Sequence, residues 1–161
     1  MNPLRDAGHS VQLRKACPAD APHVLWLEEV CMKDHATALW GQWRPADTLA
    51  TLDLAGHEMI AWQGRAAGCL ATNQTPEALH LSRLYLAPDA RNHGVGTQVL
   101  GQVITRANQQ QIPTKLSVLI TNPAVRFYQR HRFCVQRKTS ERYLMIRPYS
   151  PSQEDATHEN H

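Results

Sequence analysis

Seven stretches of the sequence have the pattern of short β-strands, in which apolar residues alternate with polar ones or form brief apolar runs. These predicted strands are residues 11–16, 58–63, 66–73, 79–86, 115–120, 133–138 and 142–146. Gly64 and Arg65 separate the second strand from the third, and a connection this short predicts a β-hairpin, in which Gly64 can supply a positive φ.

Four other stretches have the wider apolar spacing of helices. The first two are residues 21–32, with Asp20 as the expected N-cap, and residues 46–55, with Gly56 as the expected stop. A long amphipathic helix follows the glycine pair Gly94 and Gly96 and ends before Pro113. A short helix starts where Asn122 can act as N-cap and Pro123 occupies the first helical position.

Size and composition limit the organisation of the chain. A length of 161 residues with 42% hydrophobic residues predicts one domain, which we place at residues 1–147. The polar residues 148–161 predict a disordered tail. There is no apolar run of about 18 residues and the first ten residues are polar, so we expect a cytoplasmic protein with no membrane partner.

Charge is distributed unevenly along the sequence. Residues 90–140 contain eight Lys or Arg and no Asp or Glu, although the whole chain carries only +3. Such a basic region suggests an anionic partner, which a polyphosphate cofactor or a nucleic acid would satisfy, while a solvated basic surface stays open. Nucleic acid is disfavoured because the cations are spaced singly and lack interleaved exposed aromatic residues.

The candidate chemistry is concentrated between the predicted strand 79–86 and the long helix. Gly94 and Gly96 have no side chains where the backbone enters the helix. Several N–H groups can therefore converge on an anion at the positive end of the helix dipole. A Walker loop is excluded because Gly96 is followed by Thr97, and a dinucleotide fingerprint because Val99 replaces its third glycine. By themselves the two glycines also fit a plain turn at a helix start.

The surrounding residues give the glycines a more specific meaning. Residues 84–88 (LYLAP) lead into residues 91–96 (RNHGVG), and NPA at 122–124 and FY at 127–128 follow before Phe133. This combination resembles the GNAT superfamily of N-acetyltransferases, and the order of predicted elements agrees over nearly the whole chain. The resemblance implies an α/β (α+β) fold with a mixed, mostly antiparallel sheet of about six to seven strands and about four flanking helices.

The resemblance also implies a binding site for acetyl-CoA. The backbone of Leu84 and Leu86 would pair with the pantetheine arm like an added strand, Tyr85 between them is a further coenzyme-binding position, and Arg91 stands at the family's Arg or Gln position. The further coenzyme-binding positions carried over by the motifs are Asn92, His93, Gly94, Val95, Gly96 and Thr97, whose amides would bind the diphosphate, and Asn122, Ala124, Phe127, Tyr128 and Arg130.

Acetyl transfer requires a neutral amine, and an amine with a pKa near 10.4 is almost fully protonated at pH 7. His80 lies where some family members carry a general base, and a neutral imidazole suits that task, although a single histidine on a strand is more often structural. A water chain through Ser82, Glu29, Glu58 or Glu77 is an open alternative.

Two further catalytic roles come from the resemblance. Tyr128 matches the tyrosine that donates a proton to the departing thiolate, and the backbone N–H of Leu84 would polarise the thioester carbonyl. The implied mechanism is direct attack in a ternary complex. Packing against the core is the competing role for both aromatic residues of the FY pair.

Other features bear on the acceptor and on stability. Arg132 replaces the glycine that family members usually have before the final Phe, which should cost roughly 1 kcal/mol in a left-handed cap. By analogy with the family, the acceptor site would be walled by the first two helices and the later strands, where Trp26, Trp40, Trp43 and Tyr143 supply aromatic surface. Core packing is the competing role for at least two of the tryptophans. No histidine pair has metal-ligand spacing, so we predict no metal. The acceptor is unidentified, a non-catalytic coenzyme-binding module is the alternative function, and the oligomeric state stays open, a homodimer included.

Overall fold

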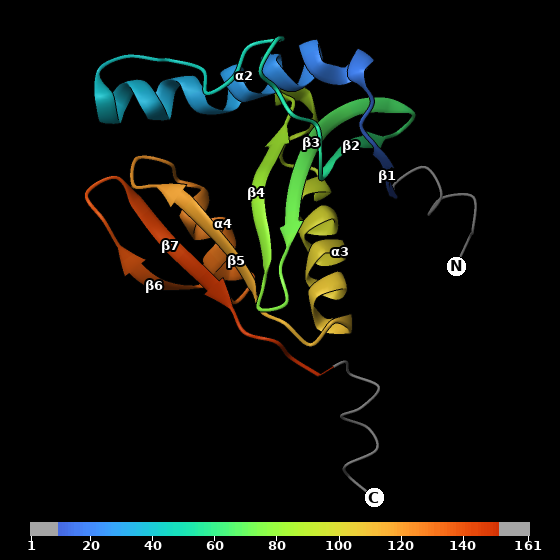
Figure 1. The fold of residues 1–161 in the computed structure, drawn as a ribbon, viewed down its shortest axis with the longest axis vertical. Helices are drawn as coiled ribbons and strands as arrows, with labels where there is room; N and C mark the ends of the chain where they lie inside the picture. The colour runs from blue at the N-terminus through green and yellow to red at the C-terminus, as the bar shows by residue number, and fades with distance from the viewer. Residues whose placement is uncertain (1–9, 152–161) are drawn as a thin grey trace, which may run out of the picture.

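A computed structural model describes residues 10–151 and places seven strands in one sheet of order β1-β2-β3-β4-β5-β7-β6 (Figure 1). The strands are β1 (Val11–Lys15), β2 (His57–Trp62), β3 (Arg65–Gln74), β4 (Leu79–Leu86), β5 (Thr114–Leu119), β6 (Cys134–Lys138) and β7 (Arg142–Arg147). Every neighbouring pair is antiparallel except the parallel pair β4 and β5. The predicted mixed, mostly antiparallel sheet is therefore confirmed.

Three α-helices accompany the sheet within residues 10–151: α2 (Ala21–Trp40), α3 (Val95–Gln109) and α4 (Ala124–Arg130). The first is longer than the predicted 21–32 and ends where Gly41 adopts φ 77° and donates its N–H to the Thr37 carbonyl. Asp20 does not cap this helix through its side chain. Its carboxylate instead accepts hydrogen bonds from Arg14 and from the N–H of Cys17, across a short 3-10 turn at Pro18–Asp20.

The predicted helix at residues 46–55 is wrong, since this segment contains turns and irregular backbone. Its short polar side chains bond to nearby backbone: the Thr51 hydroxyl accepts from the Thr48 N–H at 2.8 Å, and Asp53 from the Ala55 N–H at 2.9 Å. Such local bonds offer the backbone an alternative to the helical ladder. Leu52 and Leu54 then pack against the core formed by α2 and the sheet.

Helices cover both faces of the sheet. Apolar residues of α3 and α4 share one core cluster with β4, β5 and β7, whereas Val24 and Leu27 of α2 pack with Met59, Cys69 and Tyr85 on the opposite face. Strand register explains the division, because successive side chains of a strand point to opposite faces. Leu84 accordingly lies on the α3 side and Tyr85 on the α2 side.

The parallel strands β4 and β5 separate after two residues. They pair only at Leu79 with Thr114 and at His80 with Lys115, and beyond this point they diverge like the arms of a V (Figure 1). Helix α2 lies across the open end and bonds to both arms. The Cys31 thiol donates to the Leu86 carbonyl at 3.3 Å, and the Thr121 hydroxyl donates to the His35 carbonyl at 2.6 Å.

The predicted tail at residues 148–161 lies largely outside the described residues, which end at position 151. In the described part of the chain, no helix combines the length and the apolar character that crossing a bilayer requires.

Candidate active site

The divergence of β4 and β5 leaves one edge of β4 without a strand partner from Leu81 to Leu86. Backbone groups of successive strand residues point to opposite edges, and the Ala87 N–H bonds to the Ala67 carbonyl of β3. The backbone N–H and C=O groups of Leu84 and Leu86 therefore face the V rather than β3. An extended ligand in the V would find a row of backbone donors and acceptors, as the sequence predicts for the pantetheine arm.

The turn between β4 and α3 presents further backbone donors. Asn92 has φ 65° and Gly94 has φ 79°, two left-handed positions that bend the chain into the helix. The first helical bond joins the Gln98 N–H to the Gly94 carbonyl, so the N–H groups of residues 95–97 have no carbonyl one turn earlier. A Cβ added at Gly94 would meet no atom within 4 Å, so the space beside this residue of the turn is open.

Helix α4 closes against the first turn of α3. A Cβ on Gly96 would lie 3.4 Å from the Phe127 ring, in van der Waals contact, so α4 packs closely against this turn. Thr97 Oγ1 lies 3.3 Å from His131 Nε2. Burial, and then the positive charges of Arg130 and Arg147, lower the pKa of His131. The region beside the helix start is therefore electropositive and suited to an anion.

Arg91 does not extend freely from this turn. Its Nε donates to the Leu86 carbonyl at 3.2 Å and its Nη2 to the Cys31 sulfur at 3.4 Å, so the guanidinium lies at the end of β4. Burial raises the pKa of the Cys31 thiol, which keeps it protonated as the donor to the same carbonyl. Arg91 and Cys31 together thus occupy the Leu86 carbonyl, and at Leu86 the N–H is the backbone group left for an extended ligand.

Tyr128 lies on α4 and is only 8% exposed. Its ring packs edge-on against Phe127 and Phe133, with centroid distances of 5.2 and 5.6 Å. Burial raises the pKa of the phenol, so the hydroxyl stays protonated, and within residues 10–151 it has no hydrogen-bond partner. The ring therefore serves the core while the hydroxyl keeps an unused donor.

His80 lies at the closed end of the V, half-buried, opposite Asn73 of β3 and beside Lys115 of β5. No other residue of the described chain forms a hydrogen bond with its ring. The imidazole is therefore not committed to a structural contact.

Two of the alternative proton relays are engaged elsewhere. Glu58 forms two short bonds with Arg106 of α3, at 2.6 and 2.8 Å, and the Ser82 hydroxyl donates to the Ala71 carbonyl. Glu29 pairs with Lys33 along α2 at 3.7 Å, and Glu77 is exposed in the turn between β3 and β4. The structure thus brings none of these four carboxyl or hydroxyl groups to the free edge of β4.

The aromatic residues expected at the acceptor site lie in two places. Trp26 and Trp40 are each 44% exposed on α2, and Trp43 follows in the connection to β2. Tyr143 faces the other side of the sheet, where Lys138 Nζ lies 5.5 Å from its ring centroid. It lines a hollow of about 510 Å³ with Arg126 of α4 and is therefore not brought together with the tryptophans.

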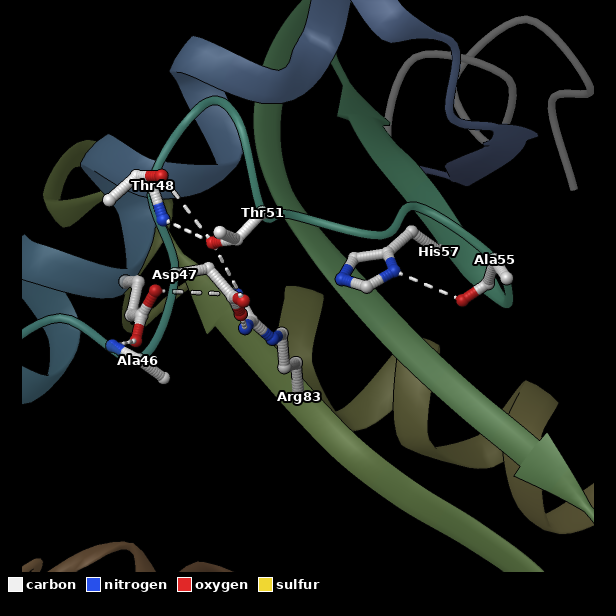
Figure 2. A network of polar contacts seen from close by, with 8 residues as sticks. Ala46, Asp47, Thr48, Thr51, Ala55, His57 and Arg83 are labelled. Carbon is white, nitrogen blue, oxygen red and sulfur yellow. Dashed lines mark hydrogen bonds and ion pairs between the residues drawn. The ribbon is translucent and has the colours of Figure 1, made fainter.

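One polar cluster next to the free edge has no counterpart among the predicted site residues. Arg83, which directly precedes Leu84, contacts Glu28 of α2 at 3.5 Å and Asp47 of the following connection at 3.1 Å (Figure 2). The Arg83 side chain is 13% exposed and that of Glu28 only 7%. A charged residue inside the apolar run 79–86 is the signal that sequence reasoning could have followed.

The site is a splayed strand pair beside an anion-binding helix start, an arrangement for an extended ligand with a charged end. The Acetyltransferase (GNAT) family model matches residues 22–133, and the chain therefore belongs to the GNAT acetyltransferase family. Members of this family use acetyl-CoA as cosubstrate. No curated protein matches this chain in sequence.

Solved structures share the fold at low sequence identity. Ard1 from Thermoplasma volcanium is 15% identical with a TM-score of 0.65, and the match covers 87% of this chain and 98% of Ard1. PaiA N-acetyltransferase from Thermoplasma acidophilum, solved with coenzyme A, is 16% identical with a TM-score of 0.66 and coverages of 87% and 99%. The ribosomal-protein-S18-alanine N-acetyltransferase from Escherichia coli is 16% identical with a TM-score of 0.64, and the match covers 89% of this chain and 96% of that enzyme.

Proposed function

We propose that this protein transfers the acetyl group of acetyl-CoA to a primary amine by direct attack in a ternary complex. The observation that carries the proposal is the free edge of β4 at Leu84 and Leu86, which runs directly into the open, donor-rich start of α3. One elongated ligand with a diphosphate can occupy both features. We further propose that residues 1–147 form one domain.

Binding of acetyl-CoA would use backbone more than side chains. The N–H groups of the turn at residues 92–97 would face the diphosphate, and the Leu84 backbone and the Leu86 N–H would pair with the pantetheine amides. Phe127 of α4, which lies beside Gly96, and Ala124 would border the same ligand. The oxygen of the Asn122 side chain holds the start of α4 by accepting the Ala124 N–H at 2.9 Å. The cation Arg130 would add charge attraction to the phosphates.

The chemistry requires three groups. The Leu84 N–H would donate to the thioester oxygen as the amine nitrogen attacks the carbonyl carbon. His80 lies four residues before Leu84 on β4, and a strand rises about 3.3 Å per residue, so His80 would accept, through a chain of waters, the proton that the amine loses. As the carbon–sulfur bond breaks, the Tyr128 hydroxyl, which is protonated and has an unused donor, would donate its proton to the thiolate.

Tyr128→Phe tests the acid assignment. We expect turnover to fall roughly 100-fold because general acid catalysis is lost, whereas acetyl-CoA affinity should change less than about threefold since the ring still packs. Release of free thiol from acetyl-CoA measures turnover with a panel containing a diamine, a polyamine, an amino sugar and peptides with a free N-terminus or lysine. Calorimetry measures affinity.

Tyr149→Phe, which makes the same change on an exposed residue beyond β7, is the matched control. Unchanged turnover in Tyr128→Phe would remove the acid assignment. Acetyl-CoA binding without thiol release for any amine would favour the alternative function, a non-catalytic coenzyme-binding module of the same fold.

A further inference from the structure

The connection between α2 and β2, residues 41–56, is tied to the rest of the molecule by a ring of polar contacts (Figure 2). We call this connection the 41–56 loop. It contains turns but no helix or strand, and structureless connections of this length in compact folds are commonly functional. The polar contacts that hold the 41–56 loop in place are therefore relevant to the function of the protein.

The ring runs through three elements. Arg83 Nη2 of β4 donates to Asp47 Oδ2 at 3.1 Å, and Arg83 Nη1 donates to Glu28 Oε2 of α2 at 3.5 Å. The other oxygen of Glu28 accepts the N–H of Ala46 at 3.4 Å, which closes the ring at the residue before Asp47. Two adjacent loop residues are thus bound to the sheet and to α2 through one guanidinium.

The Asp47 carboxylate is oriented from both sides. Its Oδ1 accepts the Thr51 hydroxyl at 3.3 Å, and that hydroxyl in turn accepts the Thr48 N–H at 2.8 Å. Since both carboxylate oxygens have donors, the ring acts as a support for the loop rather than as a free charge for a ligand. Figure 2 shows Asp47, Thr48 and Thr51 gathered at the point where the loop meets Arg83.

The position of the ring relates it to the reaction. Arg83 lies 6.0 Å from the centroid of Tyr85, on the α2 side of β4, whereas α3 and α4 cover the opposite side. An acceptor amine would approach Leu84 from the side that the coenzyme helices leave open, where the 41–56 loop lies. A buried ion pair stabilises a fold no better than apolar packing does, so stability alone does not explain why Arg83 is paired with Glu28 and Asp47 here.

We propose that Arg83 is a positioning residue that holds the 41–56 loop as a wall of the acceptor site. The inference rests on the proposed function, because it assigns the loop to the acceptor of that reaction. Arg83 touches neither reacting atom in this account. It acts through Asp47 and Ala46, and its loss should weaken acceptor binding and leave acetyl-CoA binding intact.

The tie to the loop is tested without any acceptor. In Arg83→Met we expect hydrogen–deuterium exchange of peptides covering residues 44–55 to accelerate at least tenfold. Glu28, which accepts the Ala46 N–H, and Asp47, which accepts the Thr51 hydroxyl, would lose the guanidinium that holds them in place. Arg106→Met is the matched control, since Arg106 of α3 forms an equally direct pair with Glu58 of β2, outside the peptides that are measured. It should leave exchange at 44–55 unchanged, and equal rates in Arg83→Met and the wild type would overturn the proposal.

The assignment to the acceptor site is tested by kinetics with the fastest amine of the panel above. Arg83→Met should raise KM for the amine at least tenfold and leave KM for acetyl-CoA within twofold. The KM of Arg83→Lys for the amine should lie between those of the wild type and Arg83→Met. Asp47→Asn breaks the same ring without leaving Glu28 unpaired and should reproduce the effect, which keeps the test open if Arg83→Met folds poorly.

The possible failures are distinguishable. Faster exchange at 44–55 with an unchanged KM for the amine would overturn the acceptor assignment. A wild-type protein that acetylates no amine would instead contradict the proposed function, and hydrogen exchange would still decide whether Arg83 holds the loop.

Discussion

Arg132 adopts a conformation that its side chain disfavours. It follows α4 with φ 69°, and its N–H and that of Phe133 bond to the Gln129 and Tyr128 carbonyls, so the helix ends as it would with glycine. The side chain is exposed, and its positive charge contributes, after burial, to lowering the pKa of Arg147. The sequence predicted the cost of arginine here, but not that the left-handed end would form despite it.

We expect Arg132→Gly to stabilise the fold by about 1 kcal/mol, because glycine reaches positive φ without the steric cost of a Cβ. The midpoint of urea unfolding measures the change. Arg126→Gly in the middle of α4 is the matched control and should destabilise by about 1 kcal/mol, since glycine there loses helix propensity. A loss of stability in Arg132→Gly would show that the arginine side chain contributes more than the strain removes.

At the scale of elements, the sequence located strands better than turns and helix lengths. The run 79–86 coincides with β4, and the remaining strands agree within a few residues, because alternation is read from neighbouring positions. The β2–β3 turn instead falls at Gln63 and Gly64, with φ 52° and 71°, one residue earlier than expected. Positive φ at a glutamine has no clear mark in sequence, and neither does the local bonding by Thr51 that replaces a helix at 46–55.

The position of β4 depends on a glycine in the neighbouring strand. A Cβ on Gly68 would collide with the Tyr85 carbonyl oxygen and lie 3.1 Å from Leu86 Cα, so β3 and β4 could not keep their register. We expect Gly68→Ala to destabilise the protein by roughly 2 kcal/mol and to weaken acetyl-CoA binding at least tenfold, because it displaces the edge that carries Leu84 and Leu86.

Thermal unfolding and calorimetry with acetyl-CoA measure the two effects of Gly68→Ala. Gly101→Ala is its matched control: the site lies inside α3, a Cβ there meets no atom within 4 Å, and stability should rise by about 1 kcal/mol with affinity unchanged. If Gly68→Ala bound acetyl-CoA like the wild type, the free edge of β4 would not be the pantetheine site.

For the molecule as a whole, the sequence predicted the family and the order of elements because the motifs lie in continuous segments. The ring of Glu28, Asp47 and Arg83 was not found, since its members are separated by up to 55 positions and only the fold brings them together. The same limit applies to Cys31 and Arg91, which meet at Leu86. Functional groups supplied by the backbone and by short motifs can be predicted from one sequence, whereas groups that depend on pairs of residues brought together by the fold cannot.

The charge asymmetry leads to a prediction at this largest scale. Of the eight cations in residues 90–140, only Arg106 forms an ion pair with any residue that the structure describes, so most of this positive field is uncompensated. We expect acetyl-CoA affinity to fall roughly fivefold to tenfold between 50 and 500 mM NaCl, because salt shortens the reach of exposed charges from about 14 to about 4 Å. Acetyl-pantetheine has the same thioester arm without phosphates, and calorimetry should find its affinity independent of salt. Equal salt dependence for the two ligands would mean that the basic region does not bind the coenzyme phosphates and is a solvated surface or serves another anion.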